Sequence, residues 1–171
     1  TRMKIYIPDN NIQERKYIID LLIKDFLQIP ITYEIKEVDS YILTSEYGEL
    51  YINDDFWKNN KENASYLNIN NFPHSPVWLY VDEIKKNIPF LYGNSNLKFE
   101  DHSIYCGADI FASAFFMLSR WEEILLPKDQ FGRCDENEMF VVKHGLEKRP
   151  LVNEYVELLR FLLEKIGVDI P

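Results

Sequence analysis

Residues 109–123 read DIFASAFFMLSRWEE, and this apolar segment constrains the fold more than any other part of the chain. At about 100° per residue, its apolar side chains share one broad arc of a helix. That arc holds Ile110, Phe111, Ala114, Phe115, Met117, Leu118, Trp121 and Leu125. Because such a helix needs extensive apolar cover, we expect a core helix from Asp109 to about Leu126.

The polar residues of this helix divide into two groups. Asp109, Ser113, Arg120 and Glu123 fall opposite the apolar arc, whereas Glu122 falls inside it, between Phe111 and Phe115. A buried carboxylate is costly, so Glu122 needs a cationic partner or a raised pKa. We expect Arg133 or Arg149 to be that partner, which would fasten the two C-terminal helices together.

The charged residues of this region form a candidate binding or structural cluster. Its members are Arg120, Glu122, Glu123, Arg133, His144 and Arg149. One interpretation is a catalytic or ligand-binding site. The other is an ion-pair network, with Arg133 tying back a turn and Arg149 pairing with Glu122 or Glu154. We favour the structural interpretation, because ion pairs also perturb pKa values and no second catalytic group is in view. No catalytic residue is predicted.

The rest of the chain mixes strand and helix patterns without a regular alternation. Strands are predicted at 3–8, 31–36, 41–45, 49–52, 77–81 and 88–92, the third and fourth as a hairpin across Tyr47-Gly48. A helix should begin at a capping box of Asn11 and Glu14 and end before Pro30. Residues 58–76 read as a surface excursion, and a last helix should start at Pro150 and stop at Gly167. The expected fold class is α/β or α+β, a mixed sheet flanked by helices, with two C-terminal helices.

Metal and nucleophile patterns are sparse. Asp54 and Asp55 follow a predicted strand, where metal ligands often sit, but the three histidines are isolated and no His-x-x-x-His pair exists. Neither a metal site nor a cofactor is predicted. Cys106 and Cys134 indicate neither a zinc site nor a disulfide. Cys106 precedes a helix, where its thiol pKa can fall, but we expect it to be buried and inert rather than a nucleophile paired with His144.

Charge and composition narrow the class of protein. The 171 residues, 46% of them apolar, suffice for one domain. A formal charge of −9 disfavours nucleic acid and anionic membranes as partners. No segment approaches the ~20 apolar residues of a membrane span, and the N-terminus turns polar early for a signal peptide. We therefore expect a cytoplasmic protein without a membrane partner.

Three segments in series carry a family resemblance: DIFASAFFMLSRWEE, then DQFGR at 129–133, then KHGLEKRPLVNEYVELL at 143–159. The series resembles the uncharacterised N-terminal domain that precedes the catalytic domain in bacterial polysaccharide deacetylase-like proteins. Deacetylases of that class hold a divalent metal with one Asp and two His. Here Asp54-Asp55 lacks the Gly-Pro and His-x-x-x-His elements of that pattern, so no catalytic residue is transferred.

The resemblance implies a function for residues 1–171 as a single accessory domain ahead of a deacetylase-like module. The domain would position either that module, in cis, or the glycan substrate of that module. The whole protein would act in surface-polysaccharide metabolism. One alternative is a glycan-binding or catalytic site of its own around Glu122 and the nearby arginines. Another is an interaction module that dimerises through exposed aromatic residues.

Overall fold

A six-stranded mixed sheet forms the centre of the fold in the computed structural model, which describes residues 3–171. Its strands are β1 (Met3–Ile7), β2 (Ile31–Ile35), β3 (Ser40–Thr44), β4 (Glu49–Asn53), β7 (Gly93–Phe99) and β8 (Ser103–Ala108). They lie in the order β2-β1-β3-β4-β8-β7. β1, β2, β4 and β8 run parallel to one another, and β3 and β7 run the other way.

A second sheet consists of one hairpin, β5 (Val77–Val81) with β6 (Lys86–Phe90). Residues 3–171 also form five α-helices: α1 (Ile12–Ile19), α2 (Ile110–Ser119), α3 (Trp121–Leu125), α4 (Phe140–Lys143) and α5 (Leu151–Lys165). α1 continues as a π-helical segment, Asp20–Phe26. No helix of residues 3–171 has the length and apolarity to cross a bilayer. The predicted mixed sheet flanked by helices is confirmed, and the fold is α+β.

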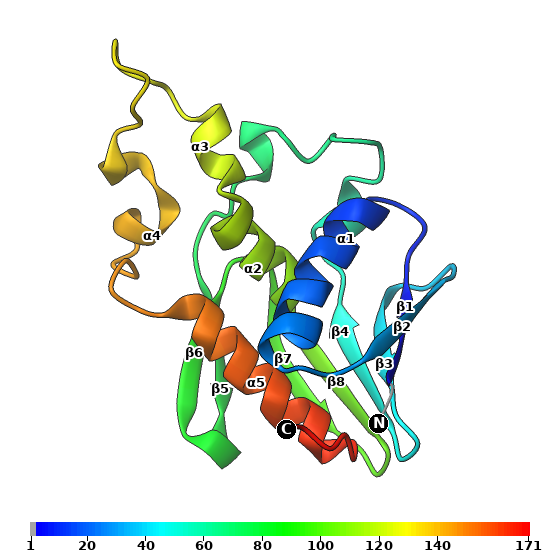
Figure 1. The fold of residues 1–171 in the computed structure, drawn as a ribbon. Coiled ribbons are helices and arrows are strands. Elements are labelled where there is room, and N and C mark those ends of the chain that lie inside the picture. The colour runs from blue at the N-terminus through cyan, green and yellow to red at the C-terminus, as the bar shows by residue number, and fades with distance from the viewer. Residues whose placement is uncertain (1–2) are drawn as a thin grey trace.

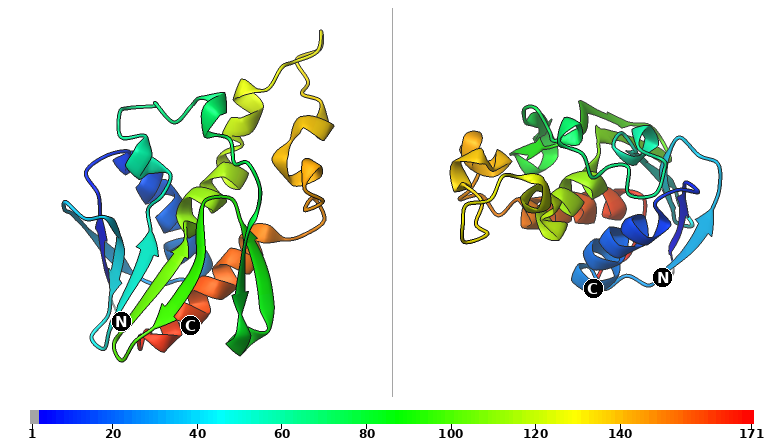
Figure 2. Two further views of the ribbon diagram at one scale, coloured as in Figure 1. Left: turned by 180° about the vertical axis from the view of Figure 1, so that it is seen from behind. Right: turned by 90° about the horizontal axis from the view of Figure 1, so that it is seen from above.

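The helices α1, α2 and α5 all cover the same face of the six-stranded sheet (Figures 1 and 2). Strand residues alternate accordingly, with Leu50 and Ile52 of β4 buried against the helices. Tyr51 of β4 and Tyr105 of β8 point to the opposite face, which no helix of the described residues covers (Figure 2). We call this opposite surface the open face.

The predicted strands and the β3–β4 hairpin are confirmed, but three local predictions are wrong. Asn11 is the N-cap residue of α1, but the predicted capping box does not form. Asn11 has a left-handed backbone (φ 49°), and its side chain makes no capping hydrogen bond. The helix expected at 109–126 breaks at Arg120, where φ is 57°, and resumes as α3. Pro150 stands before α5 as its N-cap, while Gly167, with φ 88°, ends α5 as predicted.

Strands β7 and β8 were not predicted from the sequence. Their residues include glycine, asparagine, lysine and alanine, which have low β propensity. β8 forms because Ile104, Cys106 and Ala108 face the helical side, where all three are buried. The two missed strands lie at one edge of the sheet and bring Tyr105 next to Tyr51.

Candidate functional site

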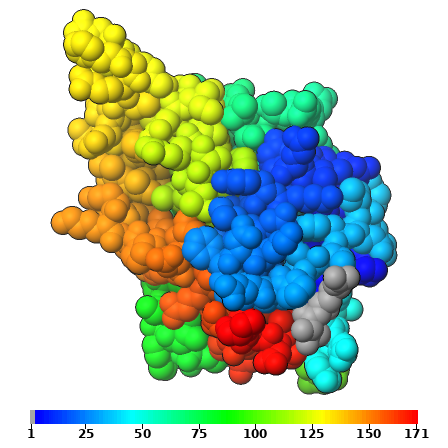
Figure 3. Space-filling view, viewed as in Figure 1, coloured from blue at the N-terminus to red at the C-terminus, as the bar shows by residue number. Residues whose placement is uncertain are grey.

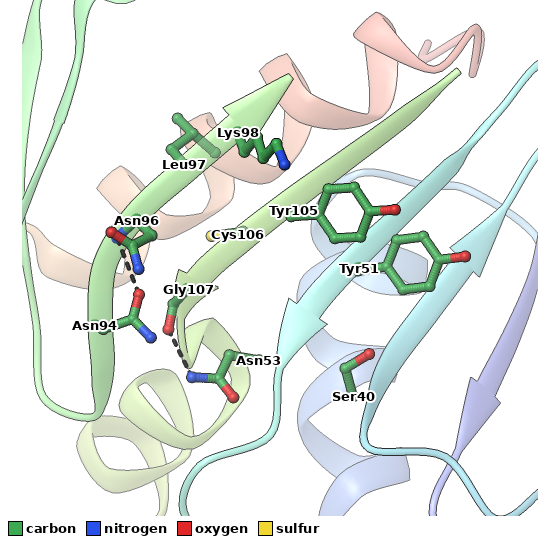
Figure 4. Close-up of a pocket in the computed structure, with 10 residues that line it drawn as sticks. All are labelled: Ser40, Tyr51, Asn53, Asn94, Asn96, Leu97, Lys98, Tyr105, Cys106 and Gly107. Carbon is green, nitrogen blue, oxygen red and sulfur yellow. Dashed lines mark hydrogen bonds between the residues drawn. The ribbon is translucent and has the colours of Figure 1, made fainter. Parts of the chain in front are cut away.

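A hollow of about 570 Å³ lies on the open face, over β4, β8 and β7 (Figure 4). Leu97, Cys106 and Gly107 are among the residues that line it, and the other lining residues have aromatic or polar side chains: Ser40, Tyr51, Asn53, Asn94, Asn96, Lys98 and Tyr105. Ligand sites in proteins commonly combine apolar or aromatic surface with a few fixed polar groups. The hollow has that composition, so we treat it as the candidate site.

Two tyrosine rings form the aromatic part of the site. Tyr51 and Tyr105 are register partners on the parallel strands β4 and β8. Their ring centroids are 4.8 Å apart and their planes differ by 8°. Figure 4 shows both rings broadside to the viewer, side by side on the open face. Tyr105 is 37% exposed, so its ring is available to a ligand.

The phenol of Tyr51 is held by a neighbour on its own strand. Its hydroxyl donates a hydrogen bond to the carboxylate of Glu49. This hydrogen bond, together with burial, raises the pKa of Tyr51 to about 12. The phenol of Tyr51 is therefore neutral at ordinary pH.

Backbone contacts fix the amide groups beside the tyrosines. Nδ2 of Asn53 donates to the carbonyl oxygen of Gly107 at 2.9 Å, and Oδ1 of Asn94 accepts from the backbone N–H of Asn96 at 3.0 Å. Gly107 makes room for this arrangement, because a Cβ there would lie 1.7 Å from Oδ1 of Asn94. The contacts leave Oδ1 of Asn53 and Nδ2 of Asn94 without a hydrogen-bond partner among residues 3–171. The site thus offers one oriented acceptor and one oriented donor.

A buried network lies behind the site, at the carboxyl ends of β1 and β4. Arg15 of α1 is fully buried and makes five hydrogen bonds, one for each N–H of its guanidinium. Two go to the carboxylate of Asp54 at 2.8 and 3.1 Å, two to Asn10, and one to the hydroxyl of Tyr41. The arginine therefore joins α1 to three segments of the sheet.

Asp109 extends this buried network to α2. One carboxylate oxygen accepts from the backbone N–H groups of Asp55 and Phe56, and the other caps α2 at the N–H of Ala112. Burial, then the charge of Asp54, raises the pKa of Asp109 to about 7. The helical wheel placed Asp109 on the polar side of a helix, but the residue is completely buried.

Asp55 completes the end of β4 beside the hollow. Its carboxylate accepts a hydrogen bond from the N–H of Gly93 at 3.2 Å. Asp54 and Asp55 therefore bind an arginine and a backbone amide, respectively. No group of three or more His, Cys, Asp or Glu within residues 3–171 is placed to hold a metal ion. Cys106 is buried, as expected, and burial raises its pKa to about 12.

Glu122 is buried as predicted, but its partner is not an arginine. Its carboxylate accepts a hydrogen bond from the backbone N–H of Phe140 at 2.8 Å. Burial raises the pKa of Glu122. A raised pKa was the second of the two options predicted for this carboxylate, beside a cationic partner. Arg149 instead binds Glu154, with Nε 3.1 Å from the carboxylate, and Arg133 binds Asp129 at 3.2 Å. Glu122 thus fastens α3 to the start of α4, and the predicted Glu122–arginine pair is wrong.

The other members of the predicted cluster also have local partners. Arg120 pairs with Glu123, three residues away, and the ring of His144 packs on Phe140 with centroids 4.4 Å apart. Arg133 belongs to the turn at 129–133, which projects from the body of the molecule (Figure 3). Of the six residues, Glu122 and His144 share a neighbour in Phe140, whereas the three arginines bind separate carboxylates.

Sequence reasoning missed the open-face site and the buried arginine, although both left signals. In the predicted strand at 49–52, Tyr51 alternates with Leu50 and Ile52, which places it on the opposite face. Arg15 lies within one turn of Ile12, Ile18 and Ile19, on the apolar side of its helix. A charged residue in that position indicates a buried ion pair.

Comparison with known protein families gives a match over nearly the whole chain. The model of DUF7033, a family of unknown function, matches residues 3–167. No curated protein matches the chain, and no solved structure does.

Proposed function

We propose that this chain, which belongs to the DUF7033 family, is a non-catalytic accessory domain that holds a glycan for a polysaccharide deacetylase-like module. The motif series at 109–159 supports the association with deacetylase-like proteins through its resemblance to their N-terminal domain. The local pairing of Arg120, Arg133 and Arg149 supports a structural role for these charges. The open face, rather than the charged C-terminal segment, is then the surface that meets the glycan.

The observation that carries the proposal is the tyrosine pair beside the oriented amides. A sugar ring presents C–H groups on its faces and hydroxyl groups around its rim. An aromatic ring packs against such an apolar face and excludes water from it. Asn53 and Asn94 supply an acceptor and a donor for hydroxyl or acetamido groups at the edge of the tyrosines. Direct and water-mediated hydrogen bonds both serve in such open sites.

Charge favours a neutral glycan over other ligands that stack on aromatic rings. Single-stranded nucleic acids also stack on tyrosine, but they require a positively charged groove. The chain carries a formal charge of −9, and the lining residue Lys98 is paired with Glu100 at 2.9 Å. The phenol of Tyr51 is neutral. An uncharged, hydroxyl-rich ligand meets the least electrostatic opposition at this site.

Calorimetric titration of the chain with N-acetylated chitooligosaccharides tests the proposal. We expect saturable binding that Tyr105→Ala weakens by about 2- to 12-fold, from the ~0.5–1.5 kcal/mol of an aromatic contact. Tyr80→Ala is the matched control, because Tyr80 is 55% exposed but belongs to the β5–β6 hairpin. Equal affinities of both variants and the unmodified chain would count against the site.

An acetate-release assay tests the non-catalytic part of the proposal. The chain is incubated with the same oligosaccharides and a divalent metal ion, and we expect no acetate above the protein-free control. Metal-dependent release would contradict the accessory role. A loss of that release in Glu122→Gln would further support the rival interpretation, a catalytic site around Glu122.

A further inference from the structure

A second hollow of about 300 Å³ lies next to the first, beyond the end of β4. It is formed by the excursion at 55–75 together with the start of β7. Amides line much of it: Asn59, Asn60, Asn70 and Asn71. The sequence reads only as an asparagine-rich surface segment here, and the glycan-binding role proposed for the tyrosines leaves these amides unused.

The linings of the two hollows meet along two segments of the chain. Asn53 lines the first hollow and Asp55 the second; Asn94 lines the first and Gly93 the second. The hydrogen bond from the Gly93 N–H to Asp55 joins these segments at the junction. Gly93 has φ +98°, and a Cβ there would lie 2.4 Å from the carbonyl oxygen of Gly107, so its backbone packs directly against the end of β8. The two hollows therefore adjoin at the end of β4 and at the start of β7.

Hydrogen bonds hold the amides of the second hollow in place. Nδ2 of Asn71 donates to Oδ1 of Asn60 at 3.0 Å, and Nδ2 of Asn60 donates to the carbonyl of Phe56 at 2.9 Å. Nδ2 of Asn59 donates to the carbonyl of Asp55 at 2.7 Å. The wall is thus preorganised, and a ligand would not have to order it. Its groups are the same uncharged donors and acceptors that flank the tyrosines.

We infer that the two hollows form one groove for an extended, uncharged oligosaccharide rather than for a single sugar. The tyrosines contact one part of the oligosaccharide, and Asn70 and His74 contact another. From Tyr51 to Asp55 the chain spans four residue steps, or about 13 Å at the rise of a strand. That span exceeds one sugar ring, so several units are needed to fill it. The inference rests on the proposed glycan-binding function.

The inference is tested by the dependence of affinity on oligosaccharide length. The probes are di-N-acetylchitobiose and hexa-N-acetylchitohexaose, titrated against the chain in a calorimeter. We expect the hexasaccharide to bind at least about tenfold more tightly, because it reaches both hollows at once. Both side chains chosen for removal, Asn70 and His74, are exposed. The variant Asn70→Ala/His74→Ala should therefore fold normally and bind the hexasaccharide only as tightly as the disaccharide.

Two results would overturn the groove while leaving the glycan-binding function in place. One is equal affinity for the two probes, with Tyr105→Ala weakening both. The other is an unchanged preference for the hexasaccharide in Asn70→Ala/His74→Ala. If neither probe binds, both the groove and the glycan-binding function fail. The two variants report on different parts of the groove. Tyr105→Ala should weaken the binding of both probes, whereas Asn70→Ala/His74→Ala should weaken only the binding of the hexasaccharide.

Discussion

Removal of Asp54 tests the buried network most severely. Asp54 accepts two of the five hydrogen bonds of Arg15, and the two side chains are 3% and 0% exposed. In Asp54→Ala the guanidinium keeps its charge but loses the one ion-pair partner it has within residues 3–171, together with two acceptors. Breaking a buried ion pair from one side costs about 3–5 kcal/mol, because the remaining charge stays away from water. We expect that loss in the free energy of unfolding.

Urea denaturation followed by circular dichroism measures this loss, and thermal denaturation checks it. For a chain of this length, about 3–5 kcal/mol corresponds to a fall in Tm of roughly 6–20 °C. Glu34→Ala is the matched control, since its ion pair with Lys4 is about half exposed on both sides. That pair should contribute far less than the buried one, because water and salt screen exposed charges.

A double variant separates the missing charge from the missing packing. Arg15→Met combined with Asp54→Leu removes both charges and fills the same space with apolar groups. We expect it to regain much of the stability lost in Asp54→Ala, since replacing a whole buried pair is often neutral. A loss of less than about 1 kcal/mol in Asp54→Ala would refute the buried ion pair as an organising contact.

Three further variants test single contacts. Glu122→Ala should lower the free energy of unfolding by about 1–3 kcal/mol, because the buried N–H of Phe140 loses its acceptor; Glu122→Gln keeps an acceptor and should lose less in the same urea titration. Asp109 has a folded pKa of about 7, above its usual value, so its contribution to stability is present in acid and is lost as pH rises from about 4 to 7. Asp109→Asn should flatten that decline in urea titrations across this pH range, and an unchanged slope would contradict it. Gly107→Ala should displace Asn94 and weaken chitooligosaccharide binding with little change in Tm; intact affinity would show that the Asn94 amide is dispensable.

Local patterns in the sequence predicted the helical side of the sheet well. The strand predicted at residues 49–52 is confirmed, and in it Leu50 and Ile52 are buried. The burial of Glu122 followed from its place among Phe111 and Phe115. Each of these inferences needs only the side-chain period of one strand or one helix.

The features that the sequence did not predict depend on contacts between segments that are distant in the chain. The partner of Tyr51 is Tyr105, on a strand of weak β propensity whose parallel register is set by tertiary packing. The partner of Glu122 is a backbone N–H, which no sequence pattern identifies in advance. The left-handed backbone of Arg120 breaks the helix at a residue of high helix propensity.

Binding of a neutral glycan to the open face is tested most directly by mapping the bound surface with nuclear magnetic resonance. Backbone amide signals of the labelled chain are followed during titration with hexa-N-acetylchitohexaose. We predict that the largest shift changes cluster at Tyr51, Asn53, Asn94 and Tyr105. Absence of shifts, or a cluster around His144 and Arg149 instead, would show that the open face does not bind the glycan.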